Sequence, residues 1–103
     1  IMIVDRDKIV AASGEFKKKY FDKVISSYLE NLIESRVSVT EKDFMELQIT
    51  NDSTELVSYS ISPIIASGDA IGAVIMLSKV HKMNDFNEKT VEIAAKFLGK
   101  YIE

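Results

Sequence analysis

The chain offers few side chains that suit catalysis. Its one histidine, His81, lies in a polar stretch between lysines, without a visible partner to position it as a general base. The serines that come closest to a nucleophile are Ser13, before Gly14, and Ser67, before Gly68. Serine and glycine are favoured at turns for their backbone geometry, and neither serine stands in the Gly-x-Ser-x-Gly pattern of a nucleophile elbow. We therefore do not predict an enzyme.

Metal and cofactor chemistry is also poorly supported by the sequence. Asp5 and Asp7 are close enough for both carboxylates to contact one cation, but their segment lacks the further carboxylates and the glycine of a calcium loop. We interpret the two aspartates as polar residues of a hairpin connection. The chain has no cysteine, which removes disulfides and thiolate ligands and is compatible with a reducing cytosol. No cofactor and no metal are predicted.

Length and charge limit the remaining classes of function. At 103 residues, with 47% apolar and 28% charged side chains, the chain has the composition of one globular domain. No apolar run approaches the roughly 20 residues that a membrane-spanning helix needs. Thirteen basic and sixteen acidic residues give a net charge of −3, and only Lys17 to Lys19 form a basic cluster. We expect a cytoplasmic domain without membrane contact and without a DNA-binding surface of its own.

The first third of the chain predicts a hairpin and two helices. Residues 1–4 and 9–13 are rich in β-branched residues and flank a short polar segment, as in a hairpin. Residues 15–21 predict a short helix. Ser27, with Glu30 three residues later, matches a capping box, so we expect the next helix to begin there.

The middle of the chain predicts a strand at the edge of a sheet. Residues 36–43 are polar and predict a loop or a ragged edge strand. Met45, Leu47 and Ile49 then alternate with polar residues, which is typical of a half-buried strand. Residues 51–53 predict the turn that ends it.

The segment 57–79 predicts two long strands joined by a turn at residues 67–69. In the first strand, apolar residues alternate with Ser58, Ser60 and Ser62, which indicates one buried and one open face. In the second, apolar residues fall on both faces, so we expect this strand to lie in the middle of the sheet. One face is predicted to carry Ile71, Ala73, Ile75 and Leu77, and the other Val74 and Met76.

A closing amphipathic helix is predicted for residues 86–103. Its apolar stripe is broader than contact with one sheet requires, which indicates that a second copy covers the remainder. The residues assigned to this dimerisation stripe are Val91, Ala94, Ala95, Leu98, Tyr101 and Ile102.

The block from Pro63 to Lys79, with Ile-Gly-Ala-Val at its centre and a long helix after it, resembles the second half of a GAF domain, the small-molecule sensing module of many regulators. Further motifs make the whole chain similar to the C-terminal halves of AbrB-family transcription regulators of sporulation. These motifs are Val4 to Asp7, Ala11 to Gly14, Lys18-Lys19, Ser26-x-x-Leu29-Glu30 and Thr90 to Leu98.

The resemblance implies an α+β GAF-like domain, with a five- to six-stranded, mainly antiparallel sheet and helices on both faces. It implies one domain over residues 1–103, and a strand that begins at residue 1 without an initiator methionine suggests a fragment. An N-terminal helix and a swapped-hairpin DNA-binding domain would then be missing. We expect a homo-oligomer, either a dimer or a tetramer, assembled through terminal helices, which contacts DNA only through the missing domain.

The resemblance also implies a pocket for an unknown small-molecule effector between the sheet and the helices. The expected ligand-binding residues are Ser13, Phe21, Ile25 and Leu29 on the roof, and Tyr59, Ile61, Val74 and Met76 on the floor. The same residues would also suit a closed core. Gly72 and Met76 favour a cavity, whereas Phe21 and Tyr59 favour a filled interior. Two functions therefore stay open: a sensor, or a purely structural oligomerisation module.

Overall fold

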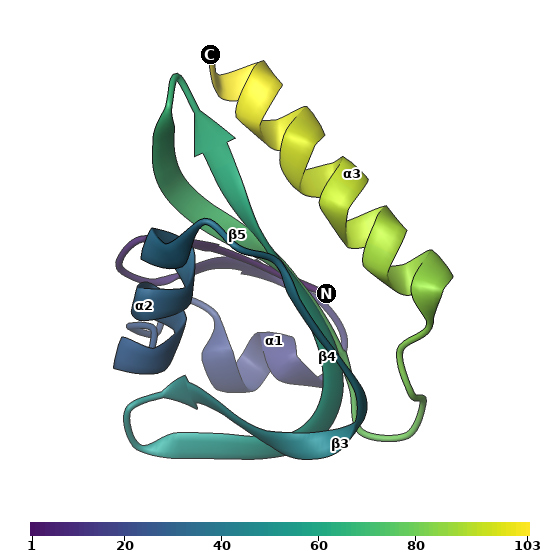
Figure 1. Ribbon diagram of the computed structural model, residues 1–103. Coiled ribbons are helices and arrows are strands. Elements are labelled where there is room, and N and C mark those ends of the chain that lie inside the picture. Colours follow the sequence, from purple (N-terminus) through teal and green to yellow (C-terminus); the bar gives the residue numbers. More distant parts are fainter.

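A computed structural model describes all residues, 1–103, as an antiparallel sheet between two helical layers (Figure 1). Two short helices, α1 and α2, cover one face of the five-stranded sheet, and the long helix α3 covers the other. The strand order is β2-β1-β5-β4-β3. The elements are β1 (Met2–Asp5), β2 (Ile9–Ala12), α1 (Glu15–Tyr20), α2 (Ser27–Ser35), β3 (Val39–Thr50), β4 (Ser53–Ala66), β5 (Asp69–Ser78) and α3 (Asp85–Ile102). The predicted α+β class and mid-sheet position of β5 are confirmed, and a GAF-like fold is compatible with this architecture.

Register decides which side chains share a face of the sheet. Tyr59 lies opposite Leu77, and Ile61 opposite Ile75, so these four side chains point to the face under α1 and α2. There they join a cluster of 17 buried residues, the main core. A smaller cluster, which includes Val91 of α3, fills the opposite face. No helix of the chain is both long and apolar enough to cross a bilayer.

The serines of β4 are buried, although the sequence predicts an open face for them. Ser58, Ser60 and Ser62 are 0%, 2% and 6% exposed, because α3 and the segment before it cover this face. Each hydroxyl has a partner, so burial leaves none unsatisfied. The Ser58 hydroxyl donates to the Glu41 carbonyl at 2.7 Å and accepts from the Met83 amide at 2.8 Å. Ser60 and Ser62 pair with hydroxyls of β3 and of the segment before it.

The structure also decides the predictions for residues 36–49, at the edge of the sheet, and for Ile71, at a bulge. Of the alternatives for residues 36–43, the ragged edge strand is right, because β3 begins at Val39 and its pairing with β4 is irregular after Glu41. Met45, expected with Leu47 and Ile49 on the apolar face of a half-buried strand, is 44% exposed, whereas the other two are buried. Ile71 packs on the α3 face and not beside Ala73. The register shift at Ile64 leaves Ile71 as an extra residue on β5, which reverses the alternation there.

The cap of α2 is Ser26, one residue before the predicted Ser27. The Ser26 hydroxyl accepts from the Leu29 amide at 3.1 Å and donates to the Gln48 carbonyl at 2.7 Å, so it fastens α2 to β3. Because Ser26 is fully buried, we expect Ser26→Ala to lower the free energy of unfolding by about 2 kcal/mol. Ser27→Ala, at an exposed neighbour, should change it by less than about 0.5 kcal/mol. Urea denaturation of both variants tests the assignment, and equal losses would contradict it.

Candidate functional site

The structure does not bring the eight expected ligand-binding residues around one cavity. Ile25, Leu29, Tyr59 and Ile61 do lie together, but as packed members of the main core, with 4% exposure or less. Their packing leaves no hollow in the interior. In this structure these four residues are therefore part of a packed core.

The other four lie elsewhere. Val74 and Met76 face α3, on the opposite side of the sheet, because their partners across β4 are Ser62 and Ser60. Phe21 follows α1 and is 51% exposed. Ser13 is exposed at the end of β2, where its hydroxyl donates to the Ile1 carbonyl. The expected roof and the expected floor are thus each divided between the main core and other parts of the surface.

Gly72 is not the bare wall of a cavity. A Cβ built at this position would overlap the carbonyl oxygen of Val4 in the neighbouring strand. The glycine is explained by the close approach of β1 and β5. Gly99 of α3 is similar, because a Cβ there would overlap the Ile65 carbonyl of β4.

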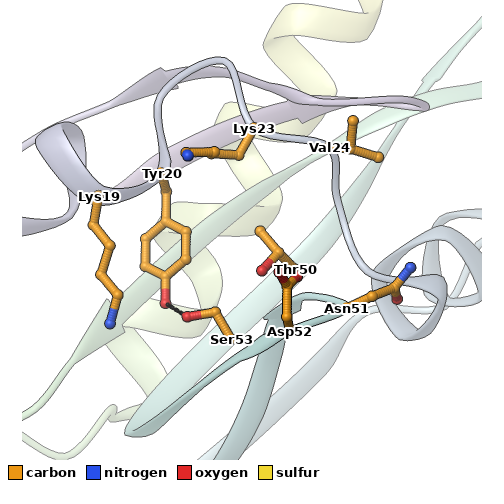
Figure 2. Close-up of a pocket in the computed structure, with 8 residues that line it drawn as sticks. All are labelled: Lys19, Tyr20, Lys23, Val24, Thr50, Asn51, Asp52 and Ser53. Carbon is orange, nitrogen blue, oxygen red and sulfur yellow. Dashed lines mark hydrogen bonds between the residues drawn. The ribbon is translucent and has the colours of Figure 1, made fainter.

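A cleft of about 430 Å³ lies instead at the edge of the α1 layer. One wall comes from the end of α1 and the segment after it, and the other from the β3–β4 turn (Figure 2). We call it the α1 cleft. Its lining residues are Lys19, Tyr20, Lys23, Val24, Thr50, Asn51, Asp52 and Ser53.

A buried hydrogen-bond network supports the inner wall of the α1 cleft. Tyr20 is 1% exposed, and its hydroxyl bonds Ser53 at 2.9 Å, as Figure 2 shows, and also the Glu55 carboxylate. Glu55 is 5% exposed, and its carboxylate forms ion pairs with Lys19 Nζ at 2.7 Å and with Lys79 Nζ at 3.4 Å. These contacts join α1, the start of β4 and the end of β5 around one carboxylate.

The network keeps Glu55 ionised. Burial raises the pKa of Glu55, but hydrogen bonds from Lys19 and Tyr20 and the charges of Lys19 and Lys79 outweigh it, so the pKa lies below its ordinary value of 4.5. A lowered carboxylate pKa contributes stability above 4.5, and this contribution disappears as the pH falls through the folded-state pKa. The α1 wall of the cleft should therefore loosen in acid.

Glu55→Gln is expected to make the stability of the domain less dependent on pH. At neutral pH the variant loses the charge-assisted bonds and should be less stable than the parent protein. Because protonation removes the same charge from the parent, the difference should shrink as the pH falls from neutral to below the ordinary pKa of 4.5. Urea denaturation across this range, with the exposed Glu46→Gln as control, measures the difference. A difference that stays constant would contradict the assigned role.

A second hollow, of about 380 Å³, lies between β4 and the ends of α2 and α3. Arg36, Lys96 and Lys100 border it. Arg36 is the C-cap of α2 and Lys100 lies in the last turn of α3, where positive charge complements the helix dipole. Helix ends thus account for Arg36 and Lys100, and Lys96 alone does not indicate an anion site.

The dimerisation stripe expected on α3 faces the domain's own sheet. Val91 and Ala95 are 0% and 1% exposed, and Ala94 and Leu98 pack beside them. Only Tyr101 and Ile102 of the expected set are exposed. The opposite side of the helix carries a different apolar row, which we call the outer α3 row: Phe86, Ile93, Phe97 and Tyr101, with 77%, 60%, 67% and 80% exposure.

Sequence reasoning missed the α1 cleft for an identifiable reason. Its residues are polar loop and turn residues, and such residues are ordinarily explained by solvation. The weak signal was Tyr20, which lies four residues after Phe16 and four before Val24. A phenol among such apolar neighbours needs a hydrogen-bond partner when it is buried. For α3, the spacing of Ile93 and Phe97 showed a wide stripe but not which part the sheet would cover.

Comparison with known proteins identifies relatives for the whole chain. The family described as stage V sporulation protein T C-terminal, transcription factor, matches residues 1–103. Stage V sporulation protein T of Bacillus subtilis (strain 168) is 43% identical over 104 residues, an alignment that covers 100% of this chain. The chain spans 58% of the length of that relative. The predicted similarity to sporulation regulators is confirmed at this level.

Proposed function

We propose that this chain, which belongs to the family of C-terminal domains of stage V sporulation protein T, is the effector-binding and assembly domain of a sporulation transcription regulator. The observation that carries the proposal is the α1 cleft, a hollow with mixed polar and apolar lining beside a buried network. The GAF assignment, AbrB-type DNA contacts through a segment outside this chain, and a cytoplasmic location are parts of the same proposal.

The network offers a route from the α1 cleft to α3. Glu55 binds Lys79, the first residue after β5, and the connection that starts there leads to α3. Its Met83 amide is held by Ser58 of β4, three residues beyond Glu55. An effector shifts the regulator only if it binds one arrangement of these elements better than another. A ligand that moves Lys19 or Tyr20 would change the contacts of Glu55, and with them the position of the segment between β5 and α3.

A thermal-denaturation screen tests effector binding. Amino acids, nucleotides and small metabolites are added singly to the domain. One that binds only the folded state should raise the midpoint saturably, by about 2.7 kcal/mol of stability at a hundredfold excess over its dissociation constant. Val24→Trp, which fills the cleft, should abolish the effect, and Val80→Trp, an equally exposed valine outside it, should not. A panel without any hit would favour the purely structural module.

Assembly is proposed through the outer α3 row and a second copy of the chain. Three acidic residues, Asp85, Glu88 and Glu92, outnumber Lys89 in the first half of α3, whereas Lys96 and Lys100 lie in the second half. An antiparallel pair of α3 helices places each acidic half against the basic half of its partner, and buries the outer α3 row between them. The same surface thus complements itself in polarity and in charge.

Phe97→Glu should convert the domain to a monomer. The substitution puts a charge in the middle of the outer α3 row, where burial against a second copy would cost several kcal/mol. Phe21→Glu, at an exposed phenylalanine on the α1 side, is the matched control and should remain dimeric. Sedimentation equilibrium of both variants and the parent protein decides the matter, and a monomeric parent would remove this proposal.

A further inference from the structure

The α1 cleft holds one cation and one anion that no residue of the chain neutralises. Lys23 and Asp52 line it and take part in no ion pair of the structure. They belong to opposite walls, since Lys23 follows α1 and Asp52 lies in the β3–β4 turn (Figure 2). Lys19, in contrast, is already held by Glu55. The charge available to a ligand is therefore one positive and one negative group.

The rest of the lining is suited to a small molecule with both polar and apolar parts. The Thr50 hydroxyl has no partner within the chain, and the Ser53 hydroxyl shares its only contact with Tyr20. Val24, 68% exposed, supplies apolar surface beside them, and the buried Tyr20 ring lies behind the inner wall. Hydroxyls flanked by opposite charges and a short apolar wall complement a compact molecule rather than a polymer.

We infer that the α1 cleft binds a small zwitterion of the amino-acid class, with its carboxylate at Lys23 and its ammonium at Asp52. This inference rests on the proposed effector function and names the ligand class for the same site. A phosphate or nucleotide would meet Asp52 directly, and Lys23 is the one lining cation that is not already held by a carboxylate of the chain. A simple cation would be repelled by Lys23, whereas a zwitterion can pair with Lys23 and Asp52 at once.

The test measures thermal midpoints and calorimetric affinities for the standard L-amino acids. Each amino acid that binds is compared with its amide, which lacks the carboxylate, and with its des-amino acid, which lacks the ammonium. Each analogue should bind about five- to tenfold more weakly than the amino acid, as expected for one partly exposed ion pair. Lys23→Gln should remove the preference over the amide, and Asp52→Asn the preference over the des-amino acid.

Control variants separate the cleft from general surface charge. Lys18→Gln and Asp69→Asn neutralise exposed residues that lie outside the cleft, and both should keep the full preferences. If amino acids stabilise the parent protein and both cleft variants equally, the ligand class has been assigned to the wrong site and the inference fails. If only another class of compound binds, and Val24→Trp blocks it, the inference fails while the proposed function stands. If no compound binds, both fail.

Discussion

Ile61→Ala is expected to lower the free energy of unfolding by about 3 to 4 kcal/mol, because the removed carbon atoms leave a hole in a filled core. Ile61 is 0% exposed and lies in the main core, opposite Ile75 and beside the edge strand at Val39. Urea denaturation should show a lower midpoint with an unchanged slope, since the folded state keeps its compactness.

The same substitution also separates a core from a ligand pocket. If Ile61 lined an empty pocket, its truncation would lower the free energy of unfolding only slightly, because water or ligand would already face the side chain. Leu56→Ala, on the same strand but 61% exposed, is the control and should cost less than about 1 kcal/mol. A cost for Ile61→Ala as small as that for Leu56→Ala would mean that the interior is hollow after all.

Gly72→Ala is expected to destabilise the domain by about 2 to 3 kcal/mol. The new methyl group overlaps the Val4 carbonyl oxygen, which is backbone and has no alternative rotamer, so β1 must separate from β5. Because β2 is attached to the sheet only through β1, this edge of the sheet should show the largest change in amide exchange.

The turn glycine Gly68 provides the comparison for Gly72. An added Cβ at Gly68 meets no atom within 4 Å, but its φ of +83° is unfavourable for alanine. Gly68→Ala should therefore cost about 1 kcal/mol, from backbone strain alone. If Gly72→Ala costs no more than Gly68→Ala, the close approach of β1 and β5 does not limit this position.

Periodicity predicted the types of the elements well because apolar residues recur at a different spacing in a helix and in a strand. The hairpin at the start and the closing helix are present within one residue of their expected bounds, whereas β4 begins at Ser53, four residues before the expected start. The pattern failed where long-range contacts determine which side chains are buried and which face they occupy. Ser58 is buried because the distant segment around Met83, whose amide bonds the Ser58 hydroxyl, covers it. Ile71 changes face because of a bulge that no local pattern shows.

The site was harder to predict than the fold. Alternation along β5 correctly put Val74 and Met76 on one face, but the register with β4 shows that this face belongs to α3. To predict a pocket floor, one must know which residues of two neighbouring strands lie on the same face. This requires the register between the strands, which the sequence alone does not show. Glu55 and Tyr20, which support the α1 cleft, are 35 residues apart and meet only in the folded chain.

The sensor and the scaffold differ in what the α1 cleft does. In both, α3 pairs subunits through the outer α3 row, and the main core is filled. In the sensor, a ligand in the cleft acts on Lys19 and Tyr20 and through Glu55 on the connection to α3. In the scaffold, the cleft is a surface hollow and Glu55 only fastens α1 to the sheet.

Mapping of amide chemical shifts during titration with a compound that stabilises the domain tests the central claim most directly. We predict saturable shifts concentrated at residues 19–24 and 50–53, with smaller shifts at Glu55, Lys79 and Met83 along the proposed route to α3. Shifts centred instead on Leu29, Tyr59 and Ile61 would mean that the packed interior opens to form the binding site, and would contradict the account.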